Sequence, residues 1–237
     1  MEKRRIIDVH THILPNVDDG SRGYDDTLRM LNEAKNEGIT DIIFTPHFRL
    51  DMFLTPASED IKVFNKVISV AKEKGIDINF YLGQELHYSP KMLSLIKSKE
   101  ALTLNNGKYF LLEFGWHVAC DFISAIKEYV DAGYTPIVVH FERFPYYALE
   151  TVREIKKAGA LIQINAFSLF AYENPRHTVN AFEMLDNDLV DFIASDIHHY
   201  KKFFIKEAYD LIVDKYGDAR AKDLFCNNAL KVLDIKE

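Results

Sequence analysis

Short apolar runs alternate with amphipathic helical stretches along the chain, and this alternation limits the possible folds more than any other feature. The runs are rich in β-branched residues and apolar almost throughout, which is typical of strands buried on both faces of a parallel sheet. They cover residues 6–9, 41–44, 78–82, 109–112, 136–139, 161–164 and 192–194.

The stretches between the runs have helical spacing. Residues 25–37, 58–74, 121–132 and 147–158 are each followed by a glycine, the usual signal for the end of a helix. Further helices are expected over residues 180–185, 203–216 and 219–233. This β-α alternation, repeated about seven times, requires parallel strands joined by helical crossovers.

Two architectures fit this pattern, a closed or nearly closed barrel and an open doubly wound sheet. Even spacing and the lack of a glycine-rich G-x-G-x-x-G turn favour an α/β barrel. No shift in composition marks a boundary, so residues 1–237 are predicted to form one domain. The one long irregular stretch, residues 48–57, is a candidate lid or substrate-facing loop.

Charge and cysteine content exclude several classes of protein. The formal net charge of −7 argues against a nucleic-acid or anionic-membrane surface. The only two cysteines, Cys120 and Cys226, form no C-x-x-C pair, and neither is followed six residues later by arginine, which removes the Cys-x₅-Arg phosphate loop. No apolar region follows the basic start, so no signal peptide is expected, and no apolar run is long enough to span a membrane; a reducing, cytoplasmic location is therefore expected.

Metal-competent side chains follow six of the seven predicted strands. In a parallel barrel these strand ends form the active-site face. Imidazole and carboxylate without thiolate suit Zn, Mn or Fe(II), and so many ligands imply at least two metals, a standard arrangement for phosphoryl chemistry. The residues are His10, His12, His47, Glu85, Glu113, His140, Asp196 and His198.

Other polar residues near these strand ends are candidates for secondary roles. Arg143 lies just beyond His140, and arginine binds phosphate bidentately. Asn165 ends the sixth predicted strand and is expected to contact substrate or a ligand. His87 and His117 are weaker candidates for the rim of the site.

An ordered set of short motifs resembles the PHP (polymerase and histidinol phosphatase) superfamily, and within it the bacterial manganese-dependent protein-tyrosine phosphatases of the CpsB/YwqE type. The motifs span about four-fifths of the chain and keep the family's order. They are DVHTHILP at residues 8–15, DDG at 18–20, TPH at 45–47, GQE at 83–85, EF at 113–114, HFERF at 140–144 and ASDIH at 194–198.

The resemblance implies a distorted seven-stranded (β/α) TIM-like barrel with up to three divalent metals, Mn²⁺ first, with Fe or Zn as alternatives. One metal would take His10, His12, Glu85 and Asp196, and Glu85 would bridge to a second held by Glu113 and His140. The third would take Asp19, His47 and His198. Arg143, His140 and Asp19 are the expected catalytic residues.

The chain departs from the family pattern at three places. Phe141 and Phe144 replace the proline and tyrosine of the H-P-E-R-Y motif, and the Gly115-Trp116-His117 segment is unusual. The family's second phosphate-binding arginine, a few residues after the last metal-binding histidine, is also missing. Lys202, or its neighbour Lys201, is expected to supply that charge, without the fork of a guanidinium.

The expected activity is hydrolysis of phosphotyrosine by metal-activated hydroxide. The expected substrate is a phosphotyrosine protein, a bacterial tyrosine autokinase of capsular or exopolysaccharide biosynthesis. A small-molecule phosphatase such as histidinol phosphatase is the main alternative, followed by a metal-dependent nuclease, an amidohydrolase and a non-catalytic kinase partner. The oligomeric state is left open.

Overall fold

The strands run parallel around a barrel, and the computed structural model describes residues 4–115 and 121–235. Every strand pair is parallel, in the orders β1-β2-β4 and β3-β5-β6-β7-β8-β9. The strands are β1 (Ile7–Thr11), β2 (Asp41–Phe44), β3 (His47–Phe48), β4 (Asn79–Leu82), β5 (Glu85–His87), β6 (Tyr109–Glu113), β7 (Thr135–Val139), β8 (Leu161–Asn165) and β9 (Phe192–Ala194).

Two strand positions are interrupted. Two residues separate β2 from β3, and two separate β4 from β5, but Gly83 N donates to Phe44 O at 2.9 Å and Glu85 N to Pro46 O at 3.0 Å across the breaks. The described strands therefore occupy the seven predicted positions. The breaks divide the wall into two sheets and so distort the seven-stranded barrel.

The barrel closes between β1 and the segment after β9. Asp196 N donates to His10 O at 3.0 Å, and His12 N donates to Ile197 O at 3.0 Å. A parallel bridge between Thr11 and Ile197 completes the contact. The closed barrel is therefore confirmed over the open doubly wound sheet.

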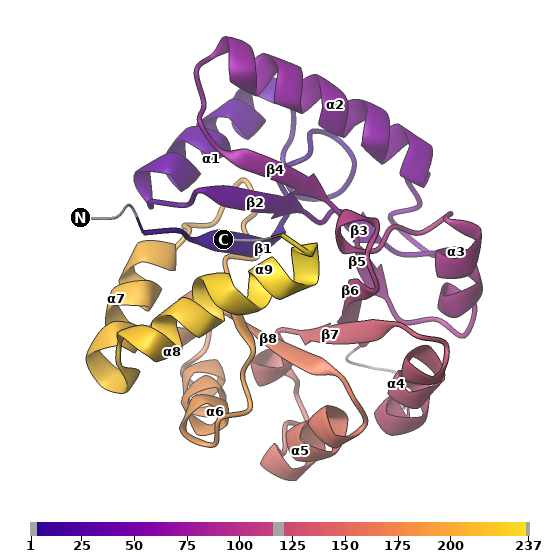
Figure 1. Ribbon diagram of the computed structural model, residues 1–237, viewed down its shortest axis with the longest axis vertical. Coiled ribbons are helices and arrows are strands. Elements are labelled where there is room, and N and C mark those ends of the chain that lie inside the picture. Colours follow the sequence, from indigo (N-terminus) through magenta and orange to yellow (C-terminus); the bar gives the residue numbers. More distant parts are fainter. Residues whose placement is uncertain (1–3, 116–120, 236–237) are drawn as a thin grey trace.

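The helices surround the barrel (Figure 1). In the described ranges they are α1 (Tyr24–Asn36), α2 (Ala57–Glu73), α3 (Met92–Ser98), α4 (Phe122–Asp131), α5 (Leu149–Lys157), α6 (Pro175–Asp186), α7 (Ile205–Tyr216), α8 (Asp218–Lys222) and α9 (Asn228–Leu233). Short 3₁₀ turns occur at η1 (Leu104–Asn106), η2 (Phe141–Arg143) and η3 (Ala166–Phe170), and a π turn, η4 (Asp223–Asn227), joins α8 to α9.

Two helices differ from the sequence prediction. Helix α3 was not predicted, and α6 begins earlier than residue 180 because Pro175 occupies its first turn and the Asn174 side chain accepts a hydrogen bond from Arg176 N. No helix among the described residues is both long and apolar enough to cross a membrane.

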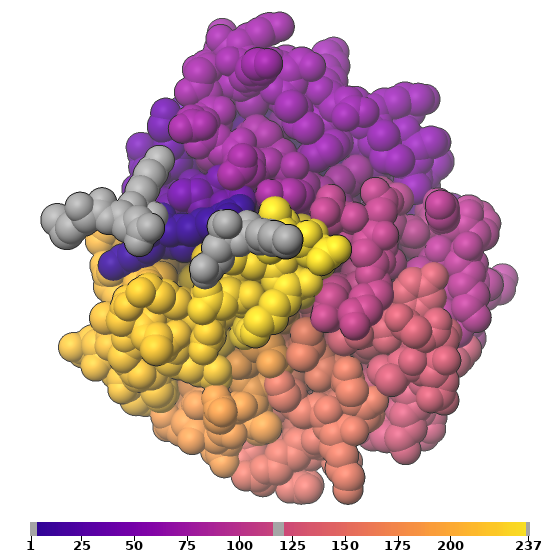
Figure 2. All heavy atoms as spheres, viewed as in Figure 1, coloured from indigo at the N-terminus to yellow at the C-terminus, as the bar shows by residue number. Residues whose placement is uncertain are grey.

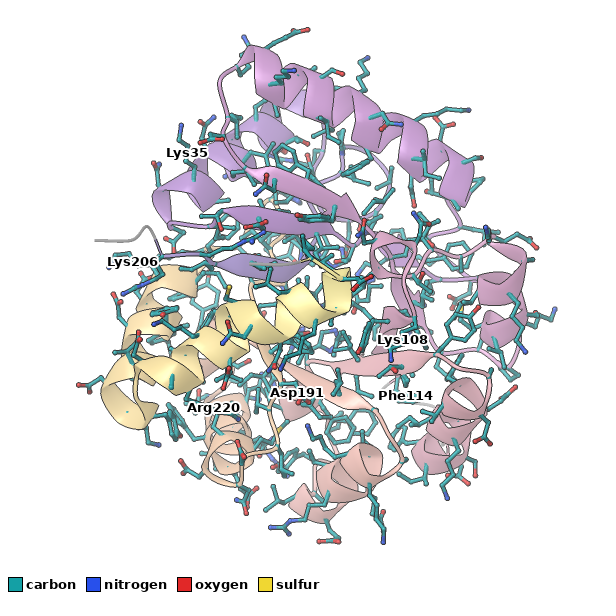
Figure 3. The ribbon with its side chains drawn as sticks, viewed as in Figure 1. Lys35, Lys108, Phe114, Asp191, Lys206 and Arg220 are labelled. Atoms are coloured by element: carbon teal, nitrogen blue, oxygen red, sulfur yellow. The ribbon has the colours of Figure 1, made fainter. Side chains whose placement is uncertain are left out.

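The C-terminal helices cover one end of the barrel (Figures 1 and 2). Leu230 and Val232 belong to the same buried cluster as Ile7, Ile137 and Phe192, so α9 packs against the strands at this end of the barrel. Arg220 Nη2 donates to Val190 O at 2.9 Å and Asn228 Nδ2 to Asp191 O at 3.0 Å, just before β9. Figure 3 labels Arg220 and Asp191 among the side chains near these helices. This arrangement leaves the opposite end, where the strands terminate, for the polar residues described next.

Candidate metal centre

All nine predicted metal ligands gather at one end of the barrel, toward which the strands run. The strands β1, β3, β5, β6, β7 and β9 each bring at least one of them to this end, and Asp19 comes from the loop after β1. Four overlapping groups have ligand atoms within 4.8 Å of one another. They are His12, Asp19, His47 and His198; His10, Glu85 and His140; His10, His12 and Asp196; and His47, Glu85 and Glu113.

A bulge in β1 turns His10 and His12 toward the site. Ile7 and Val9 pack in the cluster inside the barrel, so strict alternation would point His10 and His12 outward. The register with β2 slips between Asp8 and Thr11, which reverses the alternation. Both imidazoles are consequently buried beside each other, with their Nε2 atoms 3.1 Å apart.

Glu85 stands at the centre of the site. Its Oε2 lies 3.2 Å from His10 Nε2 and 3.3 Å from His12 Nε2, while its Oε1 lies 2.9 Å from His140 Nε2. Within the described part of the chain, the buried Oε2 accepts no hydrogen bond despite these neighbours. Burial opposes ionisation, but His47 and His10 hold the pKa of this carboxyl well below its usual value. Several nitrogens aimed at one ionised, unsatisfied oxygen fit a bound cation.

Asp196 is the second central carboxylate, in the left-handed region at φ 48°. Its Oδ1 lies 3.7 Å from His10 Nε2 and 3.5 Å from His12 Nε2. Burial opposes ionisation here too, but Lys201 and His10 keep the pKa of the Asp196 carboxyl well below its usual value. His140 is also left-handed at φ 39°, and such backbone conformations concentrate at functional sites.

The outer group, made of His12, Asp19, His47 and His198, reaches solvent at Asp19, while its histidine side chains are at most 16% exposed. The Asp19 side chain is 51% exposed, and its Oδ1 lies 3.4 Å from His198 Nε2 and 3.6 Å from His47 Nε2. The bond with His198 lowers the pKa of Asp19 to about 2. This accessible edge is where a substrate can reach the cluster.

Asp18 orients the ligands and does not join them. Its Oδ2 accepts from His12 Nδ1 at 2.7 Å and from His47 N at 2.9 Å, and its Oδ1 accepts from Gly20 N at 2.9 Å. A carboxylate that only accepts requires the proton on His12 Nδ1, so Nε2 is free to ligate a metal. The placement of Asp19 with the ligands matches the assignment implied by the family motif.

Two side-chain amides on β8, those of Asn165 and Gln163, orient His10 as Asp18 orients His12. Asn165 Nδ2 donates to Asp196 Oδ2 at 2.9 Å, and Gln163 Nε2 donates to Asn165 Oδ1 at 2.8 Å. Gln163 Oε1 therefore faces His10 Nδ1, 3.0 Å away, and must accept its proton. Asn165 is fully buried with its amide engaged, so of its two expected contacts, with substrate or with a ligand, the structure shows the one with a ligand.

Two cations share the outer oxygen of Asp196. Lys201 Nζ lies 3.0 Å from Oδ2 and Arg143 Nη1 3.4 Å from it, while Arg143 Nη2 lies 3.4 Å from Glu173 Oε2. Lys202 is different, because its side chain is 56% exposed and pairs with Glu207. The structure therefore brings Lys201 to the site in place of the expected Lys202.

Glu113 contacts His87, which the sequence analysis gave as a weaker candidate for the rim of the site. Its Oε2 lies 2.8 Å from His87 Nδ1, and it belongs to the group with Glu85 and His47. His117 lies outside the described residues. Sequence reasoning missed Asp18 and Gln163; the paired acids of the DDG motif were a signal for the first, whereas nothing marked the second.

Proteins of similar sequence include several tyrosine-protein phosphatases. The sequence pattern of the family described as capsular polysaccharide synthesis, CpsB/CapC, matches residues 6–234. The tyrosine-protein phosphatase CpsB of Streptococcus pneumoniae is 34% identical over 96% of this chain and 98% of its own. YwqE, a tyrosine-protein phosphatase of Bacillus subtilis, is 27% identical over 90% of this chain and 85% of its own.

Solved structures support the same relationship. A chain from the crystal structures of YwqE from Bacillus subtilis and CpsB from Streptococcus pneumoniae, described as unique metal-dependent tyrosine phosphatases, matches with a TM-score of 0.91. It is 25% identical and covers 98% of this chain and 96% of that one. The phosphotriesterase of Mycobacterium tuberculosis, 9% identical with a TM-score of 0.62, covers 96% of this chain and 93% of its own and shares the fold alone.

Proposed function

This chain belongs to the CpsB/CapC capsular polysaccharide synthesis family, as its motifs indicated, and we propose that it is a metal-dependent protein-tyrosine phosphatase. The observation that carries the proposal is the convergence of nine imidazole and carboxylate ligands beside Arg143 and Lys201. The proposal takes residues 1–237 as one catalytic domain. It assigns the phosphoprotein substrate to a bacterial tyrosine autokinase in the cytoplasm, without a role for nucleic acid or membrane insertion.

The donor set fits three divalent metals, with Mn²⁺ as the proposed ion. His10, His12, Glu85 and Asp196 would hold the first, and Asp19, His47 and His198 the third. Glu85, Glu113 and His140 would hold the second; in support, Glu85 contacts His140 directly and groups with Glu113. When bound, such metals supply Lewis acidity and a water activated for attack on phosphorus.

The residues of the chain supply positioning and charge. Arg143 and Lys201 converge on one oxygen of Asp196, and Arg143 also pairs with Glu173, so both cations are held beside the ligands where a phosphoryl group would bind. A guanidinium aligned in advance with the equatorial oxygens stabilises the charge that these oxygens carry in the transition state. Asn165 and Gln163 keep Asp196 and His10 oriented while this happens.

The open outer edge favours a protein substrate over a small molecule. The half-exposed Asp19 lies at the mouth, whereas a histidinol phosphatase would be expected to enclose its substrate. The single described cysteine, Cys226, is buried beside α9, far from the ligands, which fits a route without a thiolate nucleophile.

The test is a phosphatase panel on protein supplied with Mn²⁺, comparing a phosphotyrosine peptide with histidinol phosphate. We expect a clear preference for the peptide, and the reverse preference would overturn the substrate assignment. Arg143→Ala should lower kcat about 100- to 1,000-fold with unchanged metal content, because it removes one preorganised charge. Arg153→Ala removes an exposed arginine paired with Glu150 and should leave turnover intact. Near-normal turnover of Arg143→Ala would refute the role of the guanidinium.

A further inference from the structure

Tyr200 is an exposed aromatic side chain at the mouth of the metal centre. Tyr200 is 63% exposed, yet the centroid of its ring lies 5.7 Å from the His198 ring centroid and 5.0 Å from the His199 ring centroid. A large aromatic ring held open to solvent beside a metal ligand is not explained by core packing. Its position two residues after His198 fixes it at the rim.

A second aromatic ring borders the same opening. Phe53 stacks on His47, with centroids 5.4 Å apart and planes 11° apart. The loops that carry Phe53 and Tyr200 follow the strand positions on either side of β1. The outer ligands His47 and His198, 6.1 Å apart by ring centroid, therefore lie between two aromatic side chains.

Tyr200 is adjacent in sequence to Lys201, a residue proposed to bind the substrate's phosphoryl group. Lys201 reaches inward to Asp196, and its Nζ lies 6.0 Å from the Tyr200 ring centroid. A phosphate ester whose phosphoryl oxygens meet Lys201 must direct its leaving group toward the solvent, past the Tyr200 ring. A phenyl leaving group there would face the Tyr200 ring, and aromatic pairs are favourable at centroid separations of about 4.5–7 Å.

We propose that Tyr200 is a specificity-determining residue that packs against the phenyl ring of the substrate and favours aryl over alkyl phosphate monoesters. This inference rests on the proposed phosphatase function and names the leaving group that the site selects. The ring, not the hydroxyl, provides the contact, so phenylalanine should replace tyrosine.

The test measures binding without turnover. Calorimetry on manganese-loaded protein compares phenylphosphonate with methylphosphonate, which share the head group and differ in the ring. Tyr200→Ala should lower the phenyl-to-methyl affinity ratio roughly 2- to 10-fold, the worth of one aromatic pair. Tyr200→Phe should keep the wild-type ratio. Tyr146→Ala is the matched control, because Tyr146 is 80% exposed and its ring contacts no other ring in the described ranges.

The outcomes separate this inference from the proposed function. An unchanged ratio in Tyr200→Ala, an equal fall in Tyr146→Ala, or a wild-type protein that binds neither phosphonate would overturn the role of Tyr200. Protein that shows the expected ratios but does not hydrolyse a phosphotyrosine peptide would support the aryl contact and refute the phosphatase assignment.

Discussion

Asp18 gives the sharpest test of how the metal centre is organised, through the substitution Asp18→Asn. All three groups around its carboxylate are donors, namely His12 Nδ1, His47 N and Gly20 N. An amide turned either way points its NH₂ at a donor. A buried polar group left in that position costs about 1–3 kcal/mol, and loss of a group that orients a ligand typically lowers metal affinity about 10- to 100-fold.

The assay is direct binding of Mn²⁺ by calorimetry, together with phosphatase activity as a function of Mn²⁺ concentration. We expect the half-saturating concentration to rise about 10- to 100-fold, with most of the activity recovered at saturation. Asp41→Asn is the matched control, because Asp41 is also buried and bonded, to Arg5 at 2.7 Å, but lies at the start of β2, away from the ligands. An unchanged half-saturation in Asp18→Asn, or an equal rise in Asp41→Asn, would refute the reasoning.

Three further predictions follow from the structure. Lys201→Ala should raise KM for a phosphotyrosine peptide and lower kcat by about tenfold or more, because its ammonium group lies beside Asp196. Lys202→Ala removes an exposed partner of Glu207 and should change neither constant. Equal effects of the two substitutions in steady-state kinetics would contradict this prediction. Gly20→Ala should abolish tight metal binding, because an added Cβ would lie 2.0 Å from His12 O, and a Mn²⁺ titration that matches wild type would disprove it. Burial raises the pKa of Asp60 to about 7 from 3.8, so the folded state holds a proton that the unfolded state releases, and the free energy of unfolding falls as pH rises through that window. Between about pH 5 and about pH 8, Asp60→Asn should remove about 3 kcal/mol of this fall, checked by urea denaturation at those two pH values, and parallel curves for the two proteins would contradict it.

The barrel could be predicted from the sequence because its strands are buried on both faces and most of its helices end at glycine. Helix α3 was not predicted because its C-cap is Lys99, which adopts the left-handed conformation at φ 62° where a glycine would have signalled the end of a helix. The short strands β3 and β5 escaped because they are two and three residues long.

The site was predictable as a set of ligand types, but not in its support. The position of His10 and His12 after the first predicted strand marked them as ligands, while the bulge that turns them inward depends on pairing with β2. Lys201 and Lys202 are adjacent in an irregular loop, where no periodicity tells which one points inward. The role of Gln163 arises from a contact with a residue 153 positions away, which no local pattern shows.

The closure of the barrel between β1 and the segment after β9 has a consequence for synthesis on the ribosome. His10 and His12 are made early, but Asp196 and His198 emerge only after most of the chain, and the backbone bonds from Asp196 to His10 and from His12 to Ile197 form at the same seam. Contacts between such distant residues form slowly, because a long loop must close first. A nascent or truncated chain that ends before residue 196 lacks both the seam and half of its central carboxylates, so stable metal loading requires a chain that extends past His198 and has closed this seam.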